Sequence, residues 1–307
     1  MKLLKKLTSI SGASSDESRI KKFLLKYINE NKKNWKITPI IYASEEFQDC
    51  IVLVFGKPKT VIYAHIDTIG FSVAYDNQLV KIGGPDIQDG IHLTGKDKQG
   101  KIETELMVIE QENDRPILKC VYPRNIERGT ILTYKPNFRE TSSTIQSPYL
   151  DNRLGVWSAL KVAETLENGA IVFGTYEEHG GNSVGYISRF LFEKYSIRQA
   201  LISDITWITD YVTPGKGVVI SMRDSGLPRR SYLEKIIKIA ENSGIDFQLE
   251  VESAGGSDGS SLQKSDQLID WCFIGAAEDN VHTPDEIVSK YDILCMVELY
   301  KVLMKKL

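Results

Sequence analysis

Hydrophobic and polar residues follow two different patterns along the chain. Toward both ends, segments with an apolar residue at every third or fourth position predict helices, and short apolar runs between them predict buried strands. Helices are expected at residues 3–7, 18–29, 153–167, 183–194, 231–242 and 291–307. Strands are expected at residues 35–41, 50–55, 60–64, 170–176, 199–203, 218–220, 247–251 and 268–274. This alternation of strands and helices is typical of an α/β domain.

The middle of the chain has a different pattern. From residue 72 to residue 147, short runs alternate between apolar and polar residues and are broken by glycine, proline and asparagine. Strand-like stretches occur at residues 79–82, 101–107, 117–121 and 126–134. We therefore expect an α/β fold with a mixed central sheet flanked by helices, into which a small β-barrel-like domain is inserted. The larger domain would comprise residues 1–71 and 148–307, and the inserted β-rich domain residues 72–147.

Composition and charge exclude several classes of partner. Of the 307 residues, 42% are hydrophobic and 26% are charged, as in an ordinary globular protein. The formal net charge of -3 gives no electrostatic reason to expect a nucleic acid or a membrane surface as partner. The four cysteines form no C-x-x-C pair, so they are expected to be reduced core residues. The basic N-terminal segment lacks the apolar core of a signal peptide, and we expect the protein in the cytoplasm.

Two adjacent glutamates, Glu177 and Glu178, follow the strand expected at residues 170–176. A buried strand is not expected to end in two carboxylates unless a cation lies there, because an unpaired buried charge is costly. Successive strand residues point to opposite faces, so one glutamate could bind a metal while the other transfers a proton. Taken alone, such a pair more often belongs to a solvated loop.

Other strand ends carry similar chemistry. His65 and Asp67 follow one expected strand, Asp204 follows another, and His282 lies in a late loop, whereas Asp151 could be an ordinary helix N-cap. In an open α/β sheet, ligands bind beyond the carboxyl ends of the strands. Imidazole and carboxylate ligands without cysteine suit zinc, cobalt or manganese. A pair of such ions needs one bridging carboxylate and terminal ligands on each side.

Five short motifs surround these residues and occur in one order. They are Ala64-His65-Ile-Asp67, Leu150-Asp151-Asn152-Arg153, Glu177-Glu178-x-Gly180, Asp204-Ile-Thr and His282-Thr-Pro-x-Glu286. Together with the insertion between the first two motifs, they resemble the dinuclear metalloaminopeptidases of the tetrahedral aminopeptidase and glutamyl aminopeptidase type. The resemblance covers nearly the whole chain, and it implies a zinc-exopeptidase-like fold with a catalytic larger domain.

The resemblance also implies a ligand set for two divalent metal ions, zinc above all. Asp151 would bridge the ions. His65 and Glu178 would complete one ion, and Asp204 and His282 would complete the other. His179, beside Glu178, would be a bystander.

Further roles follow from the same resemblance. Glu177 would be the general base that accepts a proton from the attacking water, and Asp67 would orient His65. The Asp151–Asn152 peptide bond would be cis, and Asp258 is a candidate for substrate contact. The implied activity is hydrolysis of N-terminal residues from peptides. Hydrolysis of N-acyl amino acids or dipeptides, or a catalytically silent paralogue, remain alternatives.

The resemblance finally implies self-association. The inserted domain would mediate subunit contacts in dimers that build a dodecamer. Because residues 72–147 are fewer than the family usually has there, a smaller homo-oligomer is also expected.

Overall fold

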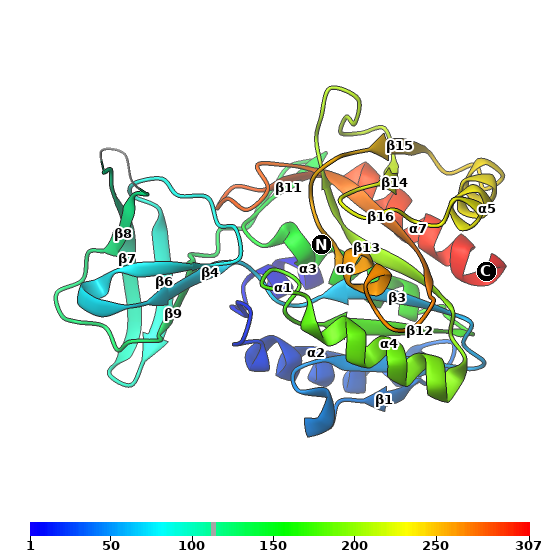
Figure 1. Cartoon of the computed structure of the whole chain (residues 1–307), viewed down its shortest axis with the longest axis horizontal. Coiled ribbons are helices and arrows are strands. Elements are labelled where there is room, and N and C mark those ends of the chain that lie inside the picture. The colour runs from blue at the N-terminus through cyan, green and yellow to red at the C-terminus, as the bar shows by residue number, and fades with distance from the viewer. Residues whose placement is uncertain (112–114) are drawn as a thin grey trace.

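The computed structural model describes residues 1–111 and 115–307, and within these ranges the chain forms an eleven-stranded sheet and a six-stranded sheet. Figure 1 shows the smaller sheet as a separate body that projects from one end of the larger α/β body. The chain leaves the larger body after β3 (Thr60–His65) and has returned to it by α3 (Leu150–Ala163), so the smaller sheet is an insertion. This arrangement confirms the predicted α/β fold with an inserted barrel-like domain. Within the described residues, no helix has the length and hydropathy needed to cross a membrane.

The large sheet has a parallel centre and antiparallel borders. The central strands β12, β3, β13 and β16 are parallel to one another, whereas β2 and β14 join them in antiparallel fashion. The carboxyl ends of the parallel strands therefore meet at one edge of the sheet. The order is β1 (Ile40–Tyr42), β2 (Ile51–Phe55), β12 (Gly169–Gly174), β3, β13 (Gln199–Trp207), β16 (Asp270–Asp279), β17 (Ile287–Ser289), β11 (Thr144–Gln146) and β10 (Arg139–Glu140), with β14 (Val218–Arg223) beside β16 and β15 (Phe247–Val251) beside β14.

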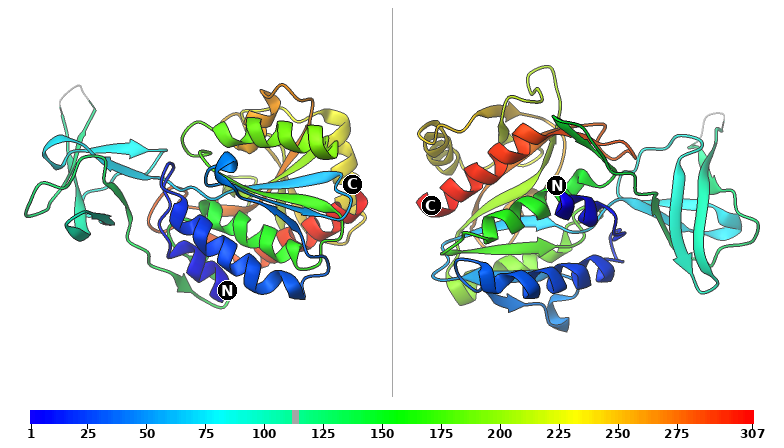
Figure 2. Two further views of the ribbon diagram at one scale, coloured as in Figure 1. Left: turned by 90° about the horizontal axis from the view of Figure 1, so that it is seen from below. Right: turned by 180° about the vertical axis from the view of Figure 1, so that it is seen from behind.

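Helices cover both faces of this sheet, each over its own hydrophobic core. One core includes residues of α1, α2, α3, α5 and α7, and the other includes residues of α4 and α6. Figure 2 shows α4 on the side of the sheet opposite to α2 and α3. The remaining helices are α1 (Lys2–Thr8), α2 (Ser18–Asn31), α4 (Asn182–Tyr195), α5 (Arg230–Glu241), α6 (Asp258–Gln263) and α7 (Lys290–Lys306), with 3-10 turns η1 (Lys32–Asn34), η2 (Glu45–Phe47) and η3 (Tyr75–Asn77).

The small sheet is nearly closed around a separate core. Its strands alternate buried and exposed residues, and the buried ones form a hydrophobic cluster that includes Phe71, Leu93 and Leu132. A bridge between Gln78 and Lys119 links its two edges. The order is β5 (Leu79–Ile82), β4 (Gly70–Val73), β9 (Ile131–Tyr134), β6 (His92–Asp97), β7 (Gly100–Ile109) and β8 (Ile117–Cys120).

The extent of the small sheet differs from the inserted domain expected at residues 72–147. The sheet begins at Gly70 and ends at Tyr134. The following strands β10 and β11 belong to the large sheet, because β11 pairs with β17. Alternating residues alone do not show which sheet a short strand joins.

Other expected strands also have different ends. Of residues 35–41, only the last two belong to β1, which begins directly after Pro39, a residue that cannot donate a hydrogen bond to a neighbouring strand. Strand β16 continues to Asp279, well past the expected end at residue 274, because it pairs with β13 over nearly its whole length. The sequence Gly275-Ala276-Ala277 carries little of the apolar pattern that identifies a strand.

Candidate metal centre

The five expected ligand residues come together at the edge where the parallel strands end. They reach it from different elements, namely the end of β3 (His65), the start of α3 (Asp151), the turn after β12 (Glu178), the middle of β13 (Asp204) and the loop after β16 (His282). They line a cavity of about 280 Å³. Among the described residues that line this cavity there is no lysine and no arginine.

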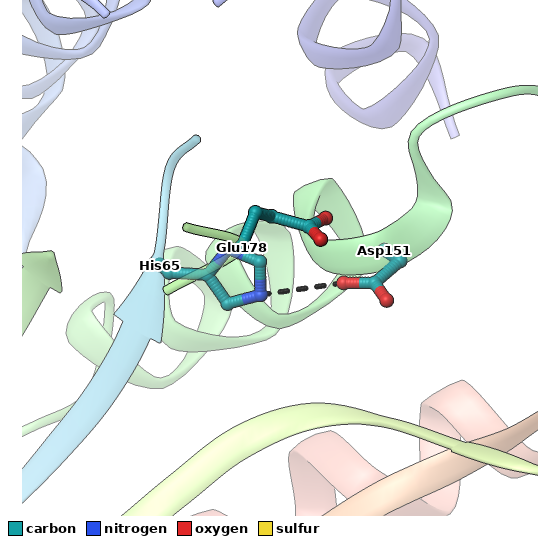
Figure 3. Close-up of side chains that lie close together, drawn as sticks. All are labelled: His65, Asp151 and Glu178. Carbon is teal, nitrogen blue, oxygen red and sulfur yellow. Dashed lines mark ion pairs between the residues drawn. The ribbon is translucent and has the colours of Figure 1, made fainter. Parts of the chain in front are cut away.

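Asp151 lies between the two histidines. Its Oδ1 atom is 3.3 Å from Nε2 of His65, and its Oδ2 atom is 3.3 Å from Nε2 of His282. Each oxygen of one carboxylate therefore faces a different imidazole. Figure 3 shows His65 and Asp151 converging with Glu178. This is the arrangement that a carboxylate bridging two ions requires.

Each histidine also approaches a second carboxylate. Nε2 of His65 is 3.5 Å from Oδ2 of Asp204, and Nε2 of His282 is 3.3 Å from Oε2 of Glu178. Two ligand atoms that are each about 2.0–2.1 Å from one tetrahedral zinc ion are about 3.4 Å apart. The distances therefore fit two pairs, which we call the His65 pair (His65 and Asp204) and the His282 pair (His282 and Glu178).

This pairing differs from the one that the family resemblance led us to expect. There, His65 was grouped with Glu178 and Asp204 with His282. Ligand atoms of His65, Asp151 and Glu178 do lie within 4.8 Å of one another, but that limit is wider than the spacing of two ligands on one ion. The closest contacts define the two pairs, because the sequence order of the residues carries no information about which ones share an ion.

Asp67 supports the cluster from behind. Its Oδ1 atom is 3.4 Å from Nδ1 of His65, an ion-pair distance longer than a normal hydrogen bond. The Ser14 hydroxyl donates to its Oδ2 atom at 2.6 Å. The backbone N–H groups of Glu177 and Glu178 donate to Asp67 at 3.3 and 3.1 Å. One fully buried carboxylate thus contacts both the imidazole of one candidate ligand, His65, and the turn that carries another, Glu178.

The start of α3 is fixed by the side chain of Asn152. The Asp151–Asn152 peptide bond is cis, which confirms the prediction from the sequence. The Asn152 amide donates to the carbonyl of Ser203 at 2.8 Å and accepts from the N–H of Gly155 at 2.9 Å. Glu286 accepts a hydrogen bond from the N–H of Asp151 at 3.2 Å. These contacts hold Asp151 beside β13.

The two adjacent glutamates lie in a turn and not at a strand end. Strand β12 ends at Gly174, and Tyr176 has a positive φ of 65°, so the expectation that the strand runs to residue 176 was wrong. Alternation of strand faces therefore does not separate the two side chains. The two side chains instead differ in their neighbours. Glu178 contacts His282, and Oε2 of Glu177 lies 3.9 Å from Nε2 of His65. Glu177 also lines the cavity.

The surroundings of Glu177, Glu178 and His282 raise the pKa values of these three side chains. Burial raises the pKa of Glu178 to about 7, and burial together with the charges of Asp204 and Asp258 raises the pKa of Glu177 well above its ordinary value. Burial alone would lower the pKa of His282, but Asp151 and Glu178 raise it to about 11. Divalent cations bound here would offset the negative charge of these buried carboxylates.

Unpaired polar atoms provide a direct test of whether metal ions fit. Oε1 of Glu178 is buried and has no hydrogen-bond partner in the described structure. An unpaired buried oxygen is costly unless a cation or a proton compensates it. Nitrogen and oxygen donors without sulfur suit zinc, cobalt or manganese. The residues present therefore fit divalent ions.

Asp258 is not where a substrate-contacting residue is expected. It is 2% exposed, and the cavity is lined by the nearby Gly255 and Gly256 instead. Neither of its carboxylate oxygens has a hydrogen-bond partner within the described residues. Burial raises the pKa of Asp258 to about 7. Its position favours an electrostatic influence on the cluster over direct contact with a substrate.

Sequence reasoning overlooked the contacts that the inserted domain makes with the cluster. Nδ1 of His282 lies 3.1 Å from the carbonyl oxygen of Gly84, and the N–H of Gly83 donates to Nδ1 of His179 at 3.2 Å. His179 was expected to be a bystander. The Gly83-Gly84-Pro85 sequence was visible as a break between strands, but nothing in its pattern indicated a neighbour 198 residues away.

The fold and the cluster together define an α/β metallopeptidase. The sequence model of the M42 glutamyl aminopeptidase family matches residues 87–299, and the chain belongs to that family. It is accordingly a metal-dependent aminopeptidase, a hydrolase of peptide bonds.

Relatives and solved structures agree with this assignment. A protein of Acetivibrio thermocellus named "Putative aminopeptidase" is 26% identical, with 97% of this chain and 96% of that protein covered. The aminopeptidase APDkam598 from the archaeon Desulfurococcus kamchatkensis has the same fold, with a TM-score of 0.86 at 21% identity over 100% of this chain and 94% of that one. The Pyrococcus horikoshii TET1 peptidase, described as assembling into a tetrahedron or a large octahedral shell, has a TM-score of 0.80 at 21% identity over 99% and 98% of the two chains.

Proposed function

We propose that the aminopeptidase works with two divalent ions, zinc above all, held on either side of Asp151. The His65 pair would complete one ion and the His282 pair the other. The observation that carries this proposal is the placement of the two oxygens of Asp151, each 3.3 Å from a different imidazole nitrogen. Cobalt and manganese accept the same donors, so metal analysis of the purified protein identifies the ion.

We propose that Glu177 is the general base. It lines the cavity beside the His65 pair and is 17% exposed, so it can reach both a ligand and water. When bound, the ions would polarise the scissile carbonyl and lower the pKa of the attacking water. Glu177 would take the proton of that water and return it to the departing amine. Burial raises the pKa of Glu177 above its ordinary value, which makes this carboxylate a stronger proton acceptor.

Replacement of Glu177 tests this role. Glu177→Gln keeps the shape of the side chain but cannot accept the proton, so kcat is expected to fall by about 10²–10⁴-fold. Metal content should stay at the wild-type value, because Glu177 belongs to neither ligand pair. The measurement is kcat on an aminoacyl-p-nitroanilide beside metal analysis of the same preparation. A Glu177→Gln variant with wild-type kcat would contradict the assignment.

We propose a peptide with a free N-terminus as the substrate. The acidic cavity has no lysine or arginine among its described lining residues, so it favours a protonated amine over an acylated one. Comparing a free aminoacyl-p-nitroanilide with its N-acetyl derivative tests this choice. Faster hydrolysis of the acetylated compound would favour the alternative deacylase activity.

We propose a homo-oligomer built from dimers, with residues 72–147 at subunit contacts. The similarity to a peptidase described as forming tetrahedral and octahedral shells supports self-association. Multi-angle light scattering would distinguish a dimer from a dodecamer.

We propose that the protein is located in the cytoplasm, because its four cysteines are buried and form no disulfide bonds. Fractionation of cells tests this location.

A further inference from the structure

We infer that the loop of residues 83–86 in the inserted domain supports the metal centre. The loop holds the His282 pair in position, whereas the large sheet holds the His65 pair. The inference rests on the proposed two-metal centre. It gives the inserted domain a role inside its own subunit, in addition to any role in assembly. The loop connects β5 to β6, and Gly84 lines the same cavity as the ligands.

The first contact fixes the ring of His282. Its Nε2 atom faces Asp151 and Glu178, and its Nδ1 atom is 3.1 Å from the carbonyl oxygen of Gly84. A carbonyl can only accept, so in the neutral ring Nδ1 carries the hydrogen and Nε2 is left free to bind a metal. Such contacts to the second nitrogen orient a ligand imidazole and increase its basicity. Gly84 thus selects the tautomer that the centre needs.

The second set of contacts fixes the backbone of His282. Its carbonyl oxygen accepts from the N–H of Asp86 at 2.9 Å and from the Tyr134 hydroxyl at 3.0 Å. The same hydroxyl lies 2.8 Å from the carbonyl oxygen of Asp86. His282 has a φ of 66°, a region that residues other than glycine adopt uncommonly, so contacts from the surrounding structure help to hold it there. The inserted domain supplies that support from its loop and from β9.

The two glycines allow the loop to approach both members of the His282 pair. A Cβ atom on Gly83 would lie 2.9 Å from Cγ2 of Ile69 and 3.2 Å from Oε2 of Glu178, and its φ of 69° disfavours other residues as well. A Cβ atom on Gly84 would lie 3.2 Å from Nδ1 of His282. That distance is short enough to displace the ring by a few tenths of an ångström, and the φ of Gly84 lies outside the left-handed region.

The His65 pair has no comparable link to the insertion. Within the described residues, the hydrogen bonds and ion pairs of the His65 and Asp204 side chains all go to the larger domain. The loop should therefore control one ion and not the other. An effect on one ion alone would indicate a specific role of the loop, whereas a general loss of stability would weaken the binding of both ions.

Gly84→Ala tests the inference, with Gly185→Ala as the matched control. A Cβ atom at Gly185, in α4, would meet open space. The metal-free full-length proteins are titrated calorimetrically with Zn²⁺. Wild type and Gly185→Ala should bind two ions, and Gly84→Ala should bind one of the two about 10–100-fold more weakly. Two ions at wild-type affinity, or equal weakening of both, would overturn the inference.

Double variants show which ion is affected. Gly84→Ala should weaken the ion that remains in His65→Ala, and should change nothing further in His282→Ala. The opposite pattern would overturn the inference. Tyr134→Phe provides an independent route, because it removes only the shared hydroxyl and keeps the ring, and it should weaken the same ion several-fold.

The two proposals fail in different ways. A wild-type protein that binds fewer than two ions would contradict the two-metal centre itself, before any variant is compared, and the inference would fall with it. A wild-type protein that binds two ions, together with a folded Gly84→Ala variant that binds both normally, would contradict the inference alone.

Discussion

His65 and His282 lie at the same distance from Asp151, 3.3 Å each, yet the protein holds the two imidazoles by different means. The His65 side chain is 2% exposed, ends a central strand and contacts a buried carboxylate of the same domain through its second nitrogen. The His282 side chain is 31% exposed, lies in a loop with a positive φ and contacts a backbone carbonyl of the inserted domain. One imidazole is positioned by a sheet, and the other by contacts between two domains.

Because the two imidazoles are held by different means, the His65 pair and the His282 pair should respond separately to substitutions. Positions on strands of a well-packed sheet are held more accurately than positions on loops. The His65 pair takes its position from β3 and β13, which are hydrogen-bonded neighbours. The His282 pair depends on whether the inserted domain keeps its place. Substitutions in the inserted domain should therefore weaken metal binding at the His282 pair before they weaken it at the His65 pair.

Removing the shared ligand should have the largest effect. Asp151→Ala takes the bridging carboxylate from both pairs, so neither ion should bind at wild-type affinity. Because metal ions supply several kcal/mol of transition-state stabilisation, activity should fall by at least about 10³-fold. The measurement is Zn²⁺ stoichiometry with kcat/KM, and the exposed Asp210→Ala is the control. One ion still bound at wild-type affinity would show that Asp151 is not shared.

Removing each histidine in turn should separate the two pairs. His65→Ala and His282→Ala are each expected to lose one of two Zn²⁺ equivalents. His65→Ala should also lower the melting temperature of the metal-free protein more, because it leaves the buried Asp67 and Asp204 without their imidazole, and breaking a buried pair costs about 3–5 kcal/mol. Equal melting temperatures for the two variants would contradict the difference in burial.

Much of the His65 pair's surroundings could be predicted from the sequence. Residues 61–64 of the expected strand form a continuous apolar run, and a histidine directly after such a run is placed at the sheet edge by the strand itself. The position of Asp204 was harder to predict, because the apolar pattern ends before Asp204 whereas β13 continues through polar residues to Trp207. Both residues were nevertheless assigned to the correct edge, because the α/β rhythm places strand ends together.

The His282 pair's surroundings could not be predicted in the same way. Its support comes from Gly84 and Tyr134, which are 198 and 148 residues away from His282. Periodicity reports local structure and carries no information on how an inserted domain docks. The sequence also could not predict which residues would share an ion, because all five residues reach one place and only the distances between them divide them into pairs.

Changing the support of His65 should have a moderate effect. Asp67→Asn keeps the shape but removes the charge beside Nδ1 of His65, so the ion at the His65 pair should bind about 10-fold more weakly. Asp67 also accepts the N–H of Glu178, and the amide oxygen of asparagine can still accept a hydrogen bond. The ion at the His282 pair should therefore change less. Calorimetry with Zn²⁺ measures both, and equal weakening would show that the two pairs share their support.

Removing the charge of Asp258 should have the smallest effect, and it should depend on pH. Asp258 is buried, has no hydrogen-bond partner within the described residues and interacts electrostatically with His65, Asp204 and Asp67. Its pKa is raised from 3.8 to about 7 by burial above all, so the folded protein favours the protonated carboxyl. The stability that this group contributes is therefore full below about pH 4 and is lost as the pH rises toward 7.

Asp258→Asn removes that dependence while it keeps the size of the side chain. The metal-free variant should match wild type at pH 5 more closely than at pH 8, where it should have the higher melting temperature, because an amide never becomes charged. Asp210→Asn, at an exposed position, should follow wild type at both values. Parallel curves for Asp258→Asn and wild type would mean that Asp258 carries no charge across this range or has a partner at high pH. In either case, Asp258 would add no uncompensated buried negative charge near the His65 pair. Buried charge would then not distinguish the surroundings of that pair from those of the more exposed His282.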